Sequence, residues 1–556
     1  MTWGVERWTV GDLADRAAER FRDREALCFR DRRWSFGQFQ GDVDRAARGL
    51  LALGVRTGEH VALWVPNRPE WLHLFFAVAK IGAVIVPINT RLRTVDLEYV
   101  VRQSDSATLV TVDRWGPVGF QEILRELCPE LETTTPSAFS SSRCPSLRRV
   151  LVLGDRVSQG AFSWSEVVEA GGRVSEGALS ERHAAVAPAD TVLIMYTSGT
   201  TGFPKGAMHG HGIVRTVADG ASRWGMTSRD VILMYLPLFH TFGLYEGVLM
   251  FLLTGARMVL MERFDPAEAL RLLARERATY LCGFDTHYQD LMDHPAFSAT
   301  DVRSLRLAFL PAGMASTEAV ARRVNRLLCR SVSAYGMTEI GTGACRSFLD
   351  APEDERCLAS GYPAPGYGYQ VIDPATGRAL PPGTPGELCV RGYGVMRGYY
   401  NKPEETARTI DGEGWLHTGD RAVMDQDGFI RFMGRYKELL KVGGENVDPL
   451  EVEALLLRHS AVSQAKVVGV PDRRLGEVAV ACVIPKEGEG VTLEDLLTFC
   501  QGKMASFKIP RHVLFLKEYP TTSSGKVQKF LLREQAMMML GLSPAGSDGD
   551  STSKAE

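Results

Sequence analysis

The chain has 556 residues, of which 45% are hydrophobic and 24% are charged. This length exceeds one core of roughly 150 residues, and the composition excludes a fibrous or mainly disordered protein. The formal net charge of -3 gives no electrostatic footprint for nucleic acid, so no such partner is expected. The 10 cysteines form no C-x-x-C pair, which favours reduced thiols. Residues 1–20 lack the apolar run of a secretory signal, so a cytoplasmic location is expected.

Short apolar runs alternate with helix-like segments in the first part of the chain. Residues 61–65 predict a buried strand, residues 70–81 a helix and residues 83–87 a second strand. Residues 192–196 predict another buried strand, which leads into a loop rich in Gly, Thr and Ser. Strands that alternate with helices favour an α/β fold.

The apolar stretch 231–253 is long enough to resemble a membrane span. Pro237, His240 and Glu246 interrupt it, so a buried strand, a loop and a buried helix are the preferred interpretation, and no membrane span is expected. Further on, residues 467–470 and 478–484 predict strands of a smaller C-terminal unit. The tail 541–556 is rich in Ser, Gly and Asp and is expected to be disordered.

The most informative segment is the loop Tyr196-Thr-Ser-Gly-Thr-Thr-Gly-Phe-Pro-Lys-Gly206. Its glycines let backbone N–H groups approach an anion, while its hydroxyls and Lys205 add donors and charge, as nucleotide phosphates require. The loop lacks the G-K-[ST] ending of a Walker A motif. It resembles the phosphate loop of the adenylate-forming superfamily, which includes acyl-CoA synthetases, adenylation domains of peptide synthetases and beetle luciferases. The resemblance implies that ATP is bound by Thr197, Ser198, Gly199, Thr200, Thr201, Gly202 and Lys205.

Further motifs of the N-terminal part are similar to the superfamily's acyl and magnesium sites. Pro237-Leu-Phe-His240 resembles the acyl-site motif, which implies that His240 shapes the entrance for the acid. Tyr335-Gly-Met-Thr-Glu339 resembles the nucleotide and magnesium motif, which implies that Thr338 donates to the α-phosphate and Glu339 binds Mg2+. The same resemblance assigns three more residues to the adenine and acid sites: Gly313, Tyr335 and Gly336.

The later motifs resemble those that complete the ATP site and serve the second step. The resemblance implies that Asp420 accepts from both ribose hydroxyls and that Arg435 contacts ribose and phosphate. Lys526, in Pro520-Thr-Thr-Ser-Ser-Gly-Lys526, matches the adenylation lysine, although Thr521 stands where Arg or Lys is usual. The loop implied to face the thiol, residues 441–446, supplies Lys441, Gly443 and Gly444.

The resemblance extends along the chain up to the tail and implies both a fold and an activity. It implies a large multi-layer N-terminal domain of β-sheets flanked by helices (1–434), a hinge at 435–437 with Lys437 as the hinge residue, and a small mobile α+β C-terminal domain (438–540). The implied reaction uses Mg2+ and ATP to form an acyl-adenylate and pyrophosphate, and then transfers the acyl group to coenzyme A. The preferred acid is a medium-chain fatty or aryl acid. The sequence does not decide whether the protein forms a homodimer.

Three alternatives remain at this point. The first is a stand-alone adenylation enzyme that loads a carrier protein; such domains usually place an Asp in the segment equivalent to 237–243, where this chain has His240. The second is a fatty-acyl-AMP ligase, or a relative that adenylates nitrite or another oxyanion. The third, a non-catalytic binding protein, is disfavoured by the intact residues Lys526, Glu339, Asp420 and Arg435.

The turn Gly283-Phe284-Asp285-Thr286-His287-Tyr288 departs from the apolar Gly-Val-Pro-Thr-Met-Tyr-like pattern of acyl-CoA synthetases. The resemblance assigns Phe284, Asp285 and His287 to the acyl pocket. Asp285 either caps the following helix, or Asp285 or His287 binds a polar group of the acid. A buried carboxylate without a partner would be costly, so the second interpretation requires a donor on the substrate.

Overall fold

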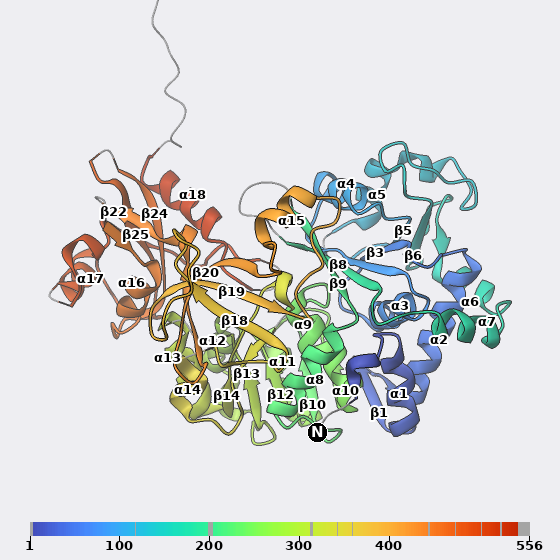
Figure 1. Ribbon diagram of the computed structural model, residues 1–556, viewed down its shortest axis with the longest axis horizontal. Coiled ribbons are helices and arrows are strands. Elements are labelled where there is room, and N and C mark those ends of the chain that lie inside the picture. Colours follow the sequence, from blue (N-terminus) through green and yellow to red (C-terminus); the bar gives the residue numbers. More distant parts are fainter. Residues whose placement is uncertain are drawn as a thin grey trace, which may run out of the picture.

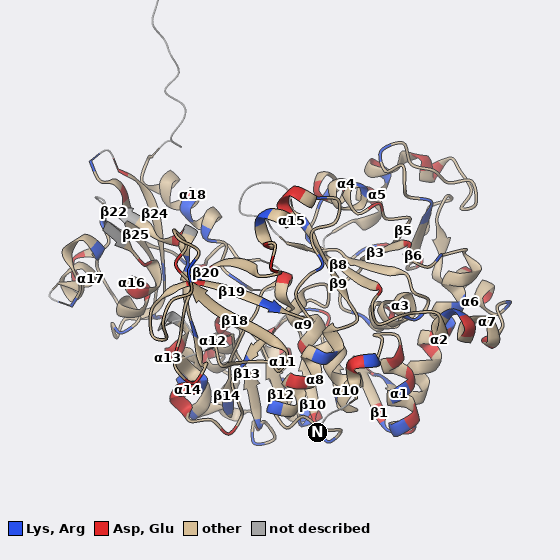
Figure 2. Cartoon of the chain, viewed as in Figure 1, with Lys and Arg blue, Asp and Glu red and all other residues tan. Residues whose placement is uncertain are grey.

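A computed structural model describes residues 4–116, 118–197, 204–311, 315–341, 343–358, 360–442, 445–472, 474–501, 503–522 and 525–542. The predicted α/β class is confirmed, since sheets flanked by helices form most of the described chain (Figure 1). Charged residues of both signs are interspersed along the elements (Figure 2). All 10 cysteines lie within the described residues and are free thiols, as expected.

The first large sheet has the strand order β7-β6-β5-β3-β4-β8-β9 and is parallel except for the last pair. The runs predicted at 61–65, 83–87 and 192–196 lie at β3, β4 and β8, and the predicted helix lies at α3. The strands are β3 (His60–Trp64), β4 (Val84–Pro87), β5 (Thr108–Val112), β6 (Arg149–Leu153), β7 (Phe162–Ser163), β8 (Thr191–Thr197) and β9 (Lys205–Gly210). The helices of this region are α1 (Asp12–Phe21), α2 (Phe36–Ala52), α3 (Pro69–Lys80), α4 (Thr94–Gln103), α5 (Phe120–Leu127), α6 (Trp164–Gly171) and α7 (Glu176–Ala184).

The second large sheet has the order β14-β13-β12-β10-β11-β1-β2, and one hydrophobic core extends over both large sheets. The strands are β1 (Glu25–Phe29), β2 (Arg32–Ser35), β10 (Val231–Met234), β11 (Arg257–Leu260), β12 (Tyr280–Cys282), β13 (Leu307–Phe309) and β14 (Arg330–Val332). The helices are α8 (Ile213–Arg223), α9 (Thr241–Gly243), α10 (Met250–Thr254), α11 (Pro266–Glu276), α12 (Asp285–Asp293), α13 (Ala315–Leu327) and α14 (Glu353–Leu358).

The apolar stretch 231–253 forms the buried strand β10, a loop, α9, a π-helical segment (Leu244–Leu249) and the start of α10. This confirms the interpretation as strand, loop and helix. Among the described residues, no helix has both the length and the apolar character that crossing a bilayer requires.

A smaller antiparallel sheet, β18-β19-β20-β21, lies between the large sheets and the C-terminal lobe (Figure 1), and β15-β16-β17 form a further three-stranded sheet. Their bounds are β15 (Ala334–Tyr335), β16 (Cys345–Arg346), β17 (Tyr362–Pro363), β18 (Tyr367–Ile372), β19 (Gly386–Gly392), β20 (Leu416–Met424) and β21 (Ile430–Arg435), with helix α15 (Pro403–Thr409). Short 3-10 turns occur at Val5–Arg7, Pro129–Glu132, Phe297–Ala299, Thr338–Ile340, Tyr436–Glu438 and Ser506–Lys508.

The C-terminal residues form a separate α+β lobe with cores of their own, drawn in orange to red at the left of Figure 1. The strands predicted at 467–470 and 478–484 lie within β24 and β25, and α16 packs against α13 of the larger part. The elements are β22 (Leu440–Val442), β23 (Glu445–Val447), β24 (Val462–Asp472), β25 (Gly476–Pro485), β26 (His512–Phe515), α16 (Pro449–Leu456), α17 (Leu493–Cys500) and α18 (Lys529–Met539). Of the predicted tail 541–556, residues 543–556 lie outside the described residues.

Candidate active site

The predicted phosphate loop connects the antiparallel strands β8 and β9. Thr197 at the end of β8 is paired with Lys205 at the start of β9, so the hairpin brings the two ends of the loop together. The predicted residues between them, Ser198, Gly199, Thr200, Thr201 and Gly202, lie outside the described residues. The Lys205 ammonium lies 4.4 Å from the centre of the Tyr399 ring and 3.5 Å from a Glu405 carboxylate oxygen.

The predicted magnesium residue contacts the same tyrosine. Glu339 lies in the 3-10 turn Thr338–Ile340, is buried, and its Oε1 accepts from the Tyr399 hydroxyl at 2.9 Å. Burial and the neighbouring Glu339 carboxylate raise the pKa of Tyr399, so this hydroxyl keeps its proton and donates. One side chain, Tyr399, therefore links the predicted magnesium motif to the lysine of the phosphate loop.

The residues predicted to bind ribose meet although they come from distant parts of the sequence. Asp420 on β20 is paired in register with Arg435 on β21. Its Oδ2 accepts from the Tyr335 hydroxyl at 2.6 Å, and its Oδ1 accepts from Arg435 Nε at 3.1 Å. Burial raises the pKa of Asp420, and the Arg435 charge opposes that rise. The structure thus joins Tyr335, Asp420 and Arg435 in one polar group, in which Tyr335 and Asp420 are buried and Arg435 is partly exposed.

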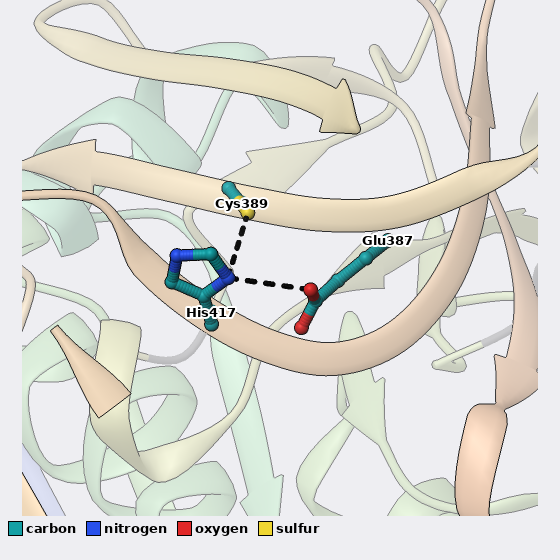
Figure 3. Close-up of side chains that lie close together, drawn as sticks. All are labelled: Glu387, Cys389 and His417. Carbon is teal, nitrogen blue, oxygen red and sulfur yellow. Dashed lines mark hydrogen bonds and ion pairs between the residues drawn. The ribbon is translucent and has the colours of Figure 1, made fainter. Parts of the chain in front are cut away.

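A cluster that the sequence motifs did not assign supports the turn before Asp420 (Figure 3). Glu387 Oε2 lies 3.2 Å from His417 Nδ1, and Cys389 Sγ lies 3.6 Å from the same nitrogen. Glu387 Oε1 also accepts from the backbone N–H of Gly419 at 3.0 Å. Gly419 has φ +67°, which favours glycine, and Asp420 follows it directly. These hydrogen bonds account for the grouping without a metal ion and fix the turn that presents Asp420.

Lys526 lies within electrostatic range of His240. The Lys526 side chain is partly exposed to solvent. Partial desolvation by the surrounding protein and the Arg435 charge lower the pKa of its ammonium, while the charges of Glu438 and Asp420 raise it by less. The pKa of His240 is lowered to about 4 by desolvation and by the Lys526 charge. His240 Nδ1 accepts from the backbone N–H of Phe242 at 3.2 Å. His240 is therefore neutral near pH 7. Lys526 also lies within electrostatic range of Asp420 and Arg435, two of the residues predicted to bind ribose.

The turn at 284–287 differs from the helix-cap prediction. The residue before α12 is Phe284, so Asp285 is the first helical residue and the prediction that Asp285 is the N-cap is wrong. His287 explains the difference, because its Nδ1 accepts from the Phe284 N–H at 3.0 Å, while Asp285 Oδ1 accepts from the N–H of Thr286 at 3.0 Å. Phe284 packs edge-on against Phe242 at 5.1 Å, next to His240.

Several predicted residues cannot be placed in this geometry. Gly313, Gly443 and Gly444 lie outside the described residues, as do the side chains of Lys437 and Lys441. Gly336 is exposed and directly follows Tyr335 at the end of β15, and Thr338 begins the 3-10 turn that contains Glu339.

Comparisons with known proteins identify a family and several similar proteins. The family described as "AMP-binding enzyme" matches residues 14–400, and "AMP-binding enzyme C-terminal domain" matches residues 451–526. The chain is 37% identical to YngI of Bacillus subtilis (strain 168) over 539 residues, which cover 96% of this chain and 98% of that one. It is 36% identical to the mitochondrial medium-chain acyl-CoA ligase ACSF2 of Mus musculus over 547 residues, covering 96% and 88%. The structure of the anthranilate CoA ligase AuaEII in complex with anthranoyl-AMP matches with a TM-score of 0.85 at 27% identity, covering 98% of this chain and 100% of that one.

Proposed function

Because the chain belongs to the family of AMP-binding enzymes, it is an AMP-forming acid–thiol ligase of the acyl-CoA synthetase type, and we propose that its acid is a medium-chain fatty acid. The observation that carries this proposal is the 36% identity, over 96% of the chain, to an enzyme named as a medium-chain acyl-CoA ligase. An aromatic group beside His240 supports it, since Phe242 lies 4.9 Å from Phe309 and 5.1 Å from Phe284. An apolar group of this kind next to His240 suits an apolar acid.

In the first half-reaction, a carboxylate oxygen of the acid bonds to the α-phosphorus of ATP while the bond to the pyrophosphate oxygen breaks. The protein has to hold these groups in line and neutralise the charge that develops on phosphorus. We assign the charge of Lys526, the hydroxyl of Thr338 and the phosphate loop to this task. Glu339 offers a hard oxygen ligand that fits Mg2+, which when bound would neutralise phosphate charge.

In the second half-reaction, the sulfur of coenzyme A bonds to the acyl carbon, the thiol loses its proton and AMP leaves. Lys526 has no role in this step. We propose that the C-terminal domain turns about the hinge at Lys437, so that the loop with Lys441, Gly443 and Gly444 faces the thiol. The glycines would leave room for the narrow pantetheine arm.

An assay of different acids tests the proposed substrate. Pyrophosphate release is measured with acetate, hexanoate, octanoate, decanoate, palmitate, benzoate and anthranilate, with and without coenzyme A. We expect the highest kcat/KM with octanoate or decanoate, and acyl-CoA and AMP as products. An aryl acid is the second candidate, because of the structural likeness to an anthranilate CoA ligase; highest activity with benzoate or anthranilate would favour it. Turnover that coenzyme A does not accelerate would instead indicate a carrier-protein acceptor.

The ribose assignment of Asp420 predicts a selective effect on ATP. Asp420→Asn removes the charge that accepts from the ribose hydroxyls, and a hydrogen bond to a charged group contributes about 1.5–3 kcal/mol. We therefore expect the KM for ATP to rise about tenfold or more, while the KM for the acid changes little. Asp427→Asn, in the exposed turn between β20 and β21, is the matched control. Equal KM values for ATP in both variants would contradict the assignment.

A further inference from the structure

A hydrogen bond joins the adenylation loop to the turn that departs from the family pattern. Thr286 Oγ1, in the first turn of α12, donates to the carbonyl oxygen of Gly525 at 3.2 Å. Gly525 directly precedes Lys526 in a tight hairpin, in which Lys526 N donates to Thr522 Oγ1 at 3.0 Å. The position of the lysine backbone is therefore tied to the large domain one residue away from the lysine.

The backbone at Gly525 lies too close to His287 for a side chain at this position. Gly525 has φ +86°, and a Cβ there would lie 2.8 Å from His287 Cε1 and 2.9 Å from His287 Nε2. The His287 ring is itself fixed, because its Nδ1 is bonded to the Phe284 N–H and its ring centre lies 4.7 Å from that of Phe264. The backbone of the loop therefore packs against a His287 ring that is held in one position.

A charge interaction and a second hydrogen bond also join the large domain to the C-terminal lobe. Burial lowers the pKa of Lys466 on β24, but nearby carboxylates, Glu453 and Asp285 among them, together raise it by more, so Asp285 lies within electrostatic range of the C-terminal lobe. Arg91 Nη1 of the large domain donates to the carbonyl of Thr521, at the start of the same hairpin, at 3.2 Å. Polar groups of the large domain thus meet both ends of the loop.

We propose that Thr286 is a positioning residue, which acts through Gly525 to hold Lys526 in place for the first half-reaction. His287 then serves as the docking surface for the adenylation loop, and Asp285 faces the charge of Lys466 in the C-terminal lobe, instead of selecting the acid. This role of Thr286 rests on the proposed function, because it requires Lys526 to act in adenylation. It predicts that the contact matters only while the loop is docked.

The test compares two variants in separate half-reactions. Thr286→Val removes the hydroxyl but keeps the shape, and Thr286→Ser keeps the hydroxyl. In Thr286→Val, we expect acid-dependent ATP–pyrophosphate exchange to fall about fivefold to tenfold, as for the loss of one hydrogen bond. Thioester formation from supplied acyl-adenylate and coenzyme A should be unchanged, and Thr286→Ser should restore exchange to near the original rate.

A double-mutant cycle separates this role from a structural one. If Thr286 acts through Lys526, Thr286→Val should have little further effect in the Lys526→Ala background. A full fivefold to tenfold loss in that background would overturn the proposal, as would equal losses in both half-reactions or a changed order of preferred acids. If the unmodified enzyme shows no pyrophosphate exchange with any acid of the panel, the proposed function itself fails, and this outcome is distinct from the others.

Discussion

Replacing Lys526 by alanine is expected to lower acyl-adenylate formation by about 10²–10³-fold, the scale for losing one preorganised charged group. The ammonium lies within electrostatic range of His240, Asp420 and Arg435, and the backbone before it is bonded to Thr286. Its charge is therefore placed before the reaction begins. ATP–pyrophosphate exchange measures this half-reaction. Thioester formation from supplied acyl-adenylate should keep its rate, because that step does not use the lysine.

The matched control is Lys517→Ala, which removes an exposed lysine of the same lobe and should leave both half-reactions unchanged. The pH profile gives a second readout. Surrounding protein lowers the pKa of Lys526, so it loses its proton at a lower pH than an ordinary lysine. We expect kcat/KM for adenylation to decline on the alkaline side below that ordinary range, and Lys526→Arg to shift the decline to higher pH. Equal losses in the two half-reactions of Lys526→Ala would contradict the assignment.

Glu246→Ala is expected to lower the free energy of unfolding by about 3–5 kcal/mol. Glu246 and Arg346 form a two-pronged ion pair, with Nη2–Oε1 at 2.7 Å and Nη1–Oε2 at 3.0 Å, and both side chains are 0% exposed. The guanidinium also lies 4.7 Å from the Trp224 ring centre. Removing the glutamate takes away the carboxylate that forms this two-pronged pair with the buried positive charge. Urea unfolding of the purified protein measures the change.

Two controls test whether burial causes this effect. Glu246→Gln keeps the shape and one acceptor, so its loss should be smaller than that of Glu246→Ala. Glu268→Ala breaks the exposed ion pair with Arg271 and should cost less than about 1 kcal/mol. If Glu246→Ala and Glu268→Ala were equally stable, the buried pair would have no special role.

The elements that the sequence predicts best are the buried parallel strands. The runs at 61–65 and 83–87 are continuous and apolar because β3 and β4 are covered on both faces, and such strands leave a clear pattern. The motif residues Tyr335, Asp420 and Arg435 were also predicted individually. That they share hydrogen bonds follows from the pairing of β20 with β21 and from the tertiary fold, and neither can be read from local sequence.

The role of the 284–287 turn could not be predicted, for two physical reasons. An Asp before a helix usually caps it, but here the His287 ring accepts the Phe284 N–H and the helix begins one residue earlier. The partner of Thr286 lies 239 residues further along the chain, beyond the reach of any periodic pattern. Glu246 gives a similar example: its position in an apolar stretch argued against a membrane span, yet nothing local identified Arg346 as its partner.

The turn at residues 284–287 contacts two parts of the site, and this limits how the enzyme can be redesigned. Phe284 packs on the aromatic group beside His240, while its neighbours Thr286 and His287 contact the loop before Lys526. A substitution made there to admit a bulkier acid would also disturb the catalytic loop and slow turnover of every acid. Libraries for altered substrate range should therefore leave residues 285–287 unchanged.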